Sequence, residues 1–264
     1  MSAPPRIPAA APAWVRSALA GPERPARVVH RGADAVYLEV DGSCLGVLST
    51  SATAVPCAAR TALGELPTRL RRASLARVGG GRLLLGDTEV AVVRQVDAGV
   101  APLDVAATPE AQRHLTAAVG RRVDHVCAEL PVEALEALTV GDAAGVTALL
   151  GRGTGLTPLG DDVLAGWVAT FVAASLPVGA PVVDAVARHA YAMTTLLSAT
   201  LLDCARRGDV VPEFRRLLVD LTAVDAGGVD DSLAALLRVG HTSGAGLVLG
   251  TLLALRHLAS RSPT

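Results

Sequence analysis

The amino-acid sequence predicts an α+β protein with a β-rich N-terminal subdomain, a small antiparallel sheet or barrel, followed by a mostly helical C-terminal subdomain. Between residues 25 and 96, short apolar runs alternate with glycine and aspartate turns, which is typical of short strands. From Thr108 onward, apolar residues recur at helical spacing behind helix-start residues such as Thr and Pro. We therefore place these subdomains at residues 25–106 and 107–264.

The N-terminal residues 1–24 are expected to form an Ala/Pro-rich tail, loose over residues 1–12, and one short helix. That helix should cover residues 13–20 and end at Gly21-Pro22. Six strands are expected next, and Asp41-Gly42 is a hairpin signal between two of them. The segment between Pro56 and Pro67 gives a mixed pattern. The expected strands cover residues 27–30, 35–40, 44–48, 75–78, 82–85 and 89–94.

The helical part should open at Thr108-Pro109, where Thr can cap a helix whose first position is Pro. Residues 182–207 have one long helical pattern that ends at Gly208. The other expected helices cover residues 108–119, 122–129, 131–138, 141–150, 162–176, 212–221, 232–239 and 242–257.

Composition excludes several classes of function. The formal net charge is −1, which argues against nucleic acid and anionic membranes as partners. All 24 basic residues are Arg, and neither Lys nor Asn occurs, so lysine Schiff-base chemistry and a P-loop lysine are ruled out. The four cysteines form no CxxC pair. An uncharged run from Val163 is cut at Pro177, short of a membrane span, and we expect a cytoplasmic protein.

The segment Gly151-Arg-Gly-Thr-Gly-Leu-Thr-Pro-Leu-Gly-Asp-Asp162 is the densest in glycines and oxygen ligands. Thr157-Pro158 is a natural helix start with Thr as the cap. A glycine loop before a helix N-terminus presents free N–H groups that suit a phosphate or carboxylate. Asp161 and Asp162 are candidate catalytic groups, and a divalent cation between them is one possibility. The alternative is a capped helix whose glycines allow tight packing.

A second loop, Gly240-His-Thr-Ser-Gly244, also opens an apolar helical segment, so two helix N-termini are expected to point at one ligand. His241 is a candidate acid, base or anion ligand, and the alternative is a loop histidine bonded to backbone. In the long helical pattern, Thr194, Thr195 and Ser198 form a hydroxyl cluster, which can bond to helix carbonyls or line the site. The candidate anion-binding residues are Gly153, Gly155, Thr157, Gly160, Thr194, Thr195, Ser198, Thr242, Ser243 and Gly244.

Three motifs together resemble a bacterial family that includes the AllH subunit of oxamate carbamoyltransferase. They are Gly155-Leu-Thr-Pro-Leu-Gly-Asp-Asp162, Thr194-Thr-Leu-Leu-Ser198 and Gly240-His-Thr-Ser-Gly244. The resemblance implies a subunit of an enzyme that converts oxalurate and phosphate into oxamate and carbamoyl phosphate. It implies other subunits as partners and a small anion as the ligand.

The chain departs from the family pattern at two positions. The family usually has a serine where Leu159 stands and often an acidic residue near Gly246. Two other functions stay open: a non-catalytic assembly partner, and a small-molecule binding protein that takes an intermediate of purine degradation. Whether the chain carries catalytic groups of its own is left open by the sequence.

Overall fold

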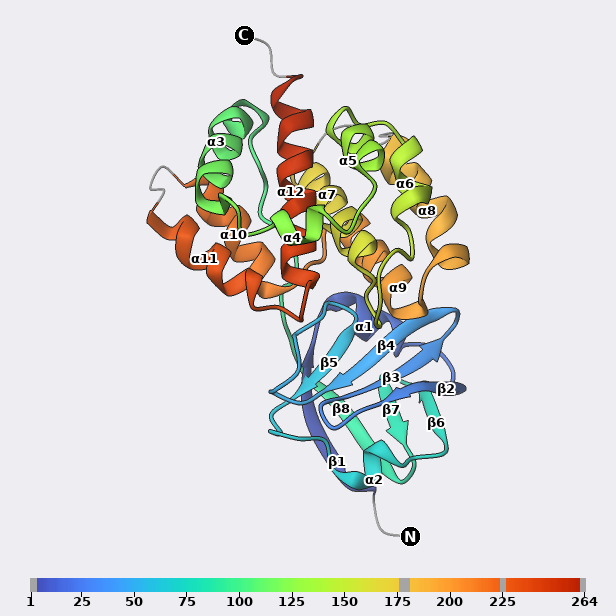
Figure 1. Cartoon of the computed structure of the whole chain (residues 1–264). Helices are drawn as coiled ribbons and strands as arrows, with labels where there is room; N and C mark the ends of the chain where they lie inside the picture. Colours follow the sequence, from blue (N-terminus) through green and yellow to red (C-terminus); the bar gives the residue numbers. More distant parts are fainter. Residues whose placement is uncertain (1–3, 176–180, 224–226, 262–264) are drawn as a thin grey trace. The chain divides into compact units, whose positions relative to one another are not determined.

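A computed structural model describes residues 4–175, 181–223 and 227–261 (Figure 1). The chain divides into two compact units, Met1–Ala98 and Gly99–Thr264. The first holds the strands and the second holds most of the helices, so the predicted α+β class is confirmed.

In the part of unit 1 that is described, the strands close into a barrel in the order β1-β5-β4-β3-β2-β6-β7-β8. Most neighbours are antiparallel, but β1 runs parallel to β8 and β4 runs parallel to β5, so the sheet is mixed rather than purely antiparallel. The strands are β1 (Arg6–Ala11), β2 (Arg24–Arg31), β3 (Ala35–Val40), β4 (Ser43–Leu48), β5 (Ala58–Thr61), β6 (Ala76–Gly79), β7 (Arg82–Leu85) and β8 (Thr88–Gln95).

Strand β1 corrects the expectation of a loose tail over residues 1–12. Ile7, Ala9 and Ala11 are buried in the barrel core, whereas the residues between them are less buried. This alternation is the mark of a strand with one face inward. The Ala/Pro composition made this strand hard to predict, because small alanine side chains contribute little to a hydrophobic pattern. The predicted short helix follows as α1 (Ala13–Ala18).

The segment with the mixed pattern contains strand β5, and helix α2 (Thr68–Arg71) follows it. The predicted hairpin between β3 and β4 is confirmed, because Asp41 and Gly42 both have positive φ, 51° and 77°. A two-residue turn of this kind matches the twist of the strands that it joins.

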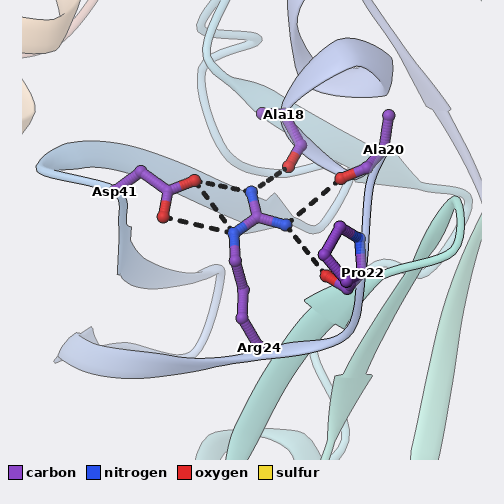
Figure 2. A network of polar contacts seen from close by, with 5 residues as sticks. All are labelled: Ala18, Ala20, Pro22, Arg24 and Asp41. Atoms are coloured by element: carbon purple, nitrogen blue, oxygen red, sulfur yellow. Dashed lines mark hydrogen bonds and ion pairs between the residues drawn. The ribbon is translucent and has the colours of Figure 1, made fainter.

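Arg24, at the start of β2, ties this hairpin to the end of α1 (Figure 2). Its guanidinium donates to the Asp41 carboxylate, with Nε–Oδ2 at 2.9 Å and Nη2–Oδ2 at 2.6 Å. It also donates to the carbonyls of Ala18, Ala20 and Pro22. A cation is favourable beside helix-end carbonyls. The Arg24 hydrogen bond lowers the pKa of Asp41 below its usual range.

Unit 2 is built around two central helices, α7 (Leu159–Ala173) and α12 (Ser243–Ala259), which are buried on almost every side. No helix in the described ranges is both long and apolar enough to span a membrane. The other elements are η1 (Val105–Ala107), α3 (Thr108–Val119), α4 (Asp124–Cys127), α5 (Val132–Thr139), α6 (Ala144–Leu149), α8 (Pro181–Met193), α9 (Leu196–Arg206), α10 (Pro212–Thr222) and α11 (Gly227–Leu237).

The single helix expected over residues 182–207 is wrong, because the chain breaks between α8 and α9 at Thr194 and Thr195. Thr195 has an extended backbone, with ψ 152°, and its hydroxyl accepts a hydrogen bond from the amide of Ser198 at 3.1 Å. It is therefore a true N-cap. Apolar residues continue at helical spacing across the break, so hydrophobic periodicity gave no sign of it.

Helices α7 and α12 run in the same direction and touch backbone to backbone. A Cβ added at Gly166 would lie 2.2 Å from the carbonyl oxygen of Leu247, and one at Gly250 would lie 2.0 Å from that of Val163. Val163 and Gly166 in α7 have the same spacing in sequence as Leu247 and Gly250 in α12. An approximate two-fold axis between the helices therefore relates one contact to the other. Their N-termini consequently lie side by side.

Candidate functional site

Three helix N-termini meet at the glycine loop, residues 151–157. Helix α7 follows this loop directly, and α12 joins it through the hydroxyls of Thr157 and Ser243, whose oxygens are 3.0 Å apart. Helix α9 joins it through Thr195, whose hydroxyl donates to the carbonyl of Leu156 at 2.6 Å. The break before α9 thus supplies a third N-terminus that the sequence had not indicated.

Asp161 accepts the hydrogen bonds that hold this arrangement together. Its Oδ1 accepts from the amide of Gly151 at 2.8 Å. Its Oδ2 accepts from the hydroxyls of Thr194 and Ser198, the latter at 2.7 Å. Burial raises the pKa of Asp161, and these three hydrogen bonds oppose that effect. Because both oxygens are occupied by donors, we assign Asp161 to holding the loop against the start of α9.

Asp162 is also buried, but its hydrogen bonding is incomplete. The nearby Ser243 hydroxyl lowers the pKa of its carboxyl, whereas Oδ2 is buried and has no hydrogen-bond partner. Burial, and to a lesser degree the charge of Asp161, raises the pKa of Asp162 from 3.8 to about 8, and the Ser243 hydrogen bond only partly offsets this. Burial therefore favours the protonated form of Asp162, whose Oδ2 is enclosed without a hydrogen-bond partner.

The raised pKa of Asp162 predicts a pH-dependent loss of stability. Between about pH 4 and pH 8 the folded chain holds a proton that the unfolded chain has released, so stability falls as pH rises through this window. Asp162→Asn should remove this dependence and stabilise the protein at pH 8, by as much as about 5 kcal/mol. Chemical denaturation at a series of pH values from 4 to 9 measures the free energy of unfolding of both proteins.

The matched control for this series is Asp184→Asn in α8, because the Asp184 side chain is exposed. An Asp162→Asn protein whose stability follows the wild-type pH curve would show that Asp162 is not the group responsible.

The structure brings seven of the predicted site residues together around the glycine loop in two groups of polar contacts: Asp161, Thr194, Thr195 and Ser198 in one, and Thr157, Ser243 and Asp162 in the other. The predicted cap of α7 is wrong, however. Pro158 occupies the N-cap position of α7 without a side-chain hydrogen bond, and Thr157 reaches across to α12 instead.

The predicted glycines fall into two groups. Gly153 and Gly155 lie in the exposed loop with φ of 115° and 93°, a conformation that glycine adopts readily. Gly160 and Gly244 are buried, and a Cβ there would lie about 2.0 Å from a backbone oxygen, so they serve helix packing. His241 is exposed in the second loop, and Thr242 is the N-cap residue of α12 without a side-chain cap.

Sequence reasoning missed two members of the site. The amide of Gly151 binds Asp161, and the positive φ of Gly151, 72°, follows from the turn after α6. Gly246 faces Asp162 and Leu159, since a Cβ there would lie 2.8 Å from the Asp162 Cβ and 3.1 Å from the Leu159 Cδ1. The two positions that depart from the family pattern, Leu159 and Gly246, therefore lie next to each other in the structure.

The surroundings of Asp161 and Asp162 do not favour the binding of a divalent cation. Both oxygens of Asp161 already accept hydrogen bonds, so a cation would have to displace three donors. In the portion of the chain that is described, no three His, Cys, Asp or Glu side chains are grouped as metal ligands.

A comparison with family models bears on this same region. Residues 149–255 match the family described as oxamate carbamoyltransferase subunit AllH. The resemblance to the AllH family is confirmed over this segment. Searches of curated proteins and of solved structures gave no significant match.

The AllH match covers all of the clustered side chains, from the glycine loop through α7 and α9 to the first helical turns of α12. The barrel lies outside it. The part of the chain that carries the polar cluster is thus the part that resembles AllH.

Proposed function

We propose that this chain is a subunit of an oxamate carbamoyltransferase-like enzyme and that it binds a small anion where the three helix N-termini meet. The observation that carries the proposal is that the AllH match encloses the whole polar cluster. The enzyme would convert oxalurate and phosphate into oxamate and carbamoyl phosphate, together with other subunits.

Electrostatics at the loop supports an anionic ligand. Helices α9 and α12 have no acidic residue in their first turns, so the positive ends of their dipoles are not neutralised there. Asp161 and Asp162 stand in the first turn of α7. The charge of Asp161 is shared among three donors, and Asp162 is protonated at neutral pH, so neither acid strongly repels an anion.

In this proposal each group of the site has a role. The exposed glycines Gly153 and Gly155 allow backbone amides to approach the anion closely. The hydroxyls of Thr157 and Ser243 can donate to it, and Asp162 supplies a buried acid behind them. His241 and Thr242 border the same N-terminus of α12 from the second loop.

Anion binding can be tested by isothermal titration of the full-length chain with phosphate and with carbamoyl phosphate. Asp162→Ala and His241→Ala should each weaken binding, by roughly tenfold for the loss of one hydrogen bond. Thr251→Val is the control, because Thr251 is buried between the same two helices and bonds only within that packing. Unchanged affinity in both site variants would rule out this assignment.

A non-catalytic assembly role is the second candidate, and one observation favours it. Leu156 at the loop tip and Met193 at the end of α8 are 43% and 40% exposed, although both are large and apolar. Met193 lies beside the loop, since a Cβ on Gly151 would lie 2.4 Å from its carbonyl oxygen. If these side chains bind another subunit, Leu156→Ser should prevent recovery of the complex in a pull-down while leaving phosphate affinity unchanged.

A further inference from the structure

The two compact units carry opposite net charges. Residues 1–98 hold 12 arginines and 8 acidic residues, a formal net charge of +4, whereas residues 99–264 hold 12 arginines and 17 acidic residues, a formal net charge of −5. The value of −1 for the whole chain is the sum of these two. Oppositely charged surfaces attract each other, so unit 1 of one copy of the chain is electrostatically suited to unit 2 of another copy.

A basic patch with an apolar centre lies at helix α2 in unit 1. Leu75 is 74% exposed, although it is large and apolar. Arg69 in α2 and Arg72 at its end are both exposed and are three residues apart, so they share one side of the helix. Arg31 is held beside them, because its Nη2 donates to the carbonyl of Ala73 at 3.0 Å. The basic patch consists of Leu75 and these three arginines.

An acidic patch with apolar ends lies on helix α5 in unit 2. Val132, Glu136 and Val140 are four residues apart, so their side chains form one stripe along the helix and its end. The two valines are 61% and 70% exposed, and Glu133 and Glu136 are exposed as well. The chain contains no arginine from residue 123 to residue 151, so no cation of this segment offsets the glutamates. The acidic patch consists of these two valines and two glutamates.

In each patch, exposed apolar side chains adjoin charges of a single sign. The acid nearest in sequence to the basic patch, Glu65, is paired with Arg71 at 3.1 Å. Within the described ranges, neither Arg72 nor Glu136 forms an ion pair, so a neighbour does not neutralise their charges. Apolar surface rimmed by charges is typical of protein contacts, and opposite charges determine which surfaces meet. The two patches are therefore complementary.

We propose that copies of this chain associate through a contact between the basic patch of one copy and the acidic patch of another. Because the two patches lie in different units, every copy carries both. The proposal goes beyond the proposed function, since no residue of either patch belongs to the candidate site. A protein of another sequence with an acidic surface is the rival occupant of the basic patch.

Analytical ultracentrifugation of the full-length chain tests this contact. The wild type should sediment as assemblies larger than one chain at about 100 μM protein in about 0.05 M NaCl. The assemblies should dissociate in about 0.5 M NaCl, because salt screens the attraction between exposed charges. Arg72→Glu and Glu136→Arg each place like charges opposite one another, so each should weaken association by at least about 100-fold and leave single chains.

Two further samples make the test specific to these patches. A chain that carries both Arg72→Glu and Glu136→Arg has the two charges exchanged, so it should assemble like the wild type. An equimolar mixture of the two single variants should also assemble, because the intact patch of each variant meets the intact patch of the other.

The matched controls are Arg82→Glu in unit 1 and Asp231→Arg in unit 2, which make the same charge changes at exposed positions outside the patches. Arg82 pairs with Gly79 in the β6–β7 hairpin, at the opposite end of this hairpin from Leu75. Both controls should assemble like the wild type. Loss of assembly with Arg82→Glu would mean that the net charge, rather than the basic patch, is responsible, and would overturn the proposal.

Other results would also contradict the contact. Wild-type protein that sediments as single chains at low salt would overturn it, and reduced recovery of other subunits with Arg72→Glu would then assign the basic patch to a different protein. A doubly reversed chain that stays single would show that the two patches do not meet. Phosphate affinity should equal that of the wild type in every variant, so failure of this contact leaves the proposed function in place.

Discussion

Gly250→Ala should destabilise the folded chain by about 3 kcal/mol or more, because the new methyl group has no room. It would lie 2.0 Å from the carbonyl oxygen of Val163 and 2.7 Å from the amide nitrogen of Trp167. Both atoms belong to the backbone of α7, so a side-chain rotation cannot relieve the contact. Helices α7 and α12 must separate, and they form the centre of unit 2. Urea denaturation measures the loss in the free energy of unfolding, provided that the variant and the wild type have the same dependence on urea concentration.

The control is the same substitution at Gly228, in helix α11. The three atoms nearest to a Cβ there would all belong to the carboxylate of Asp220, at 3.0 Å or more, and that side chain can move. Alanine is the better helix former by about 1 kcal/mol, so Gly228→Ala should be neutral or mildly stabilising. A Gly250→Ala protein as stable as Gly228→Ala would mean that the two central helices do not touch as described.

Asp161→Ala should have the second large effect, on stability and on ligand binding together. The variant leaves the amide of Gly151 and the hydroxyls of Thr194 and Ser198 without their acceptor. Donors buried without acceptors cost about 1–3 kcal/mol each, and partial access to water reduces the sum, so we expect a loss of roughly 3 kcal/mol. Phosphate affinity should fall as well, because the loop is no longer held against α9.

Asp203→Ala is the matched control in unit 2. Asp203 also accepts hydrogen bonds from side chains, those of Tyr191 and Arg206, but it lies near the surface. Its removal should cost less than about 1 kcal/mol and leave phosphate binding unchanged. Thermal unfolding and isothermal titration on the same samples report both effects. If Asp161→Ala lost binding without losing stability, Asp161 would be a ligand contact rather than a support for the loop.

Much of the fold followed from periodicity and turn chemistry. The strands from Arg24 to Leu48, the Asp41-Gly42 turn and the helix that begins at Thr108 were all anticipated. Each depends on short-range signals that lie within a few residues of one another. Strand β1 was missed because its inward residues are mostly alanine, and because its parallel neighbour β8 and its antiparallel neighbour β5 lie far away in sequence.

The sequence motifs indicated the residues of the candidate site but not their arrangement. The motifs pointed to Asp161, Asp162 and the hydroxyls of Thr194 and Ser198. They did not reveal that Thr194 and Thr195 interrupt a helix, because the bonds that stabilise the break come from Asp161 and Leu156. Nor did they distinguish the two aspartates, since the difference lies in which oxygens find donors after folding.

The bonds that fix the glycine loop also bear on when the site acquires its shape. Thr194, Thr195 and Ser243 stand 33, 39 and 86 residues away from their partners in this region. Contacts of such sequence separation form only after the intervening chain has closed. The loop should therefore become ordered late in folding, after α9 and α12 have docked on α7. Pulsed hydrogen exchange should find the Gly151 amide among the last to gain protection.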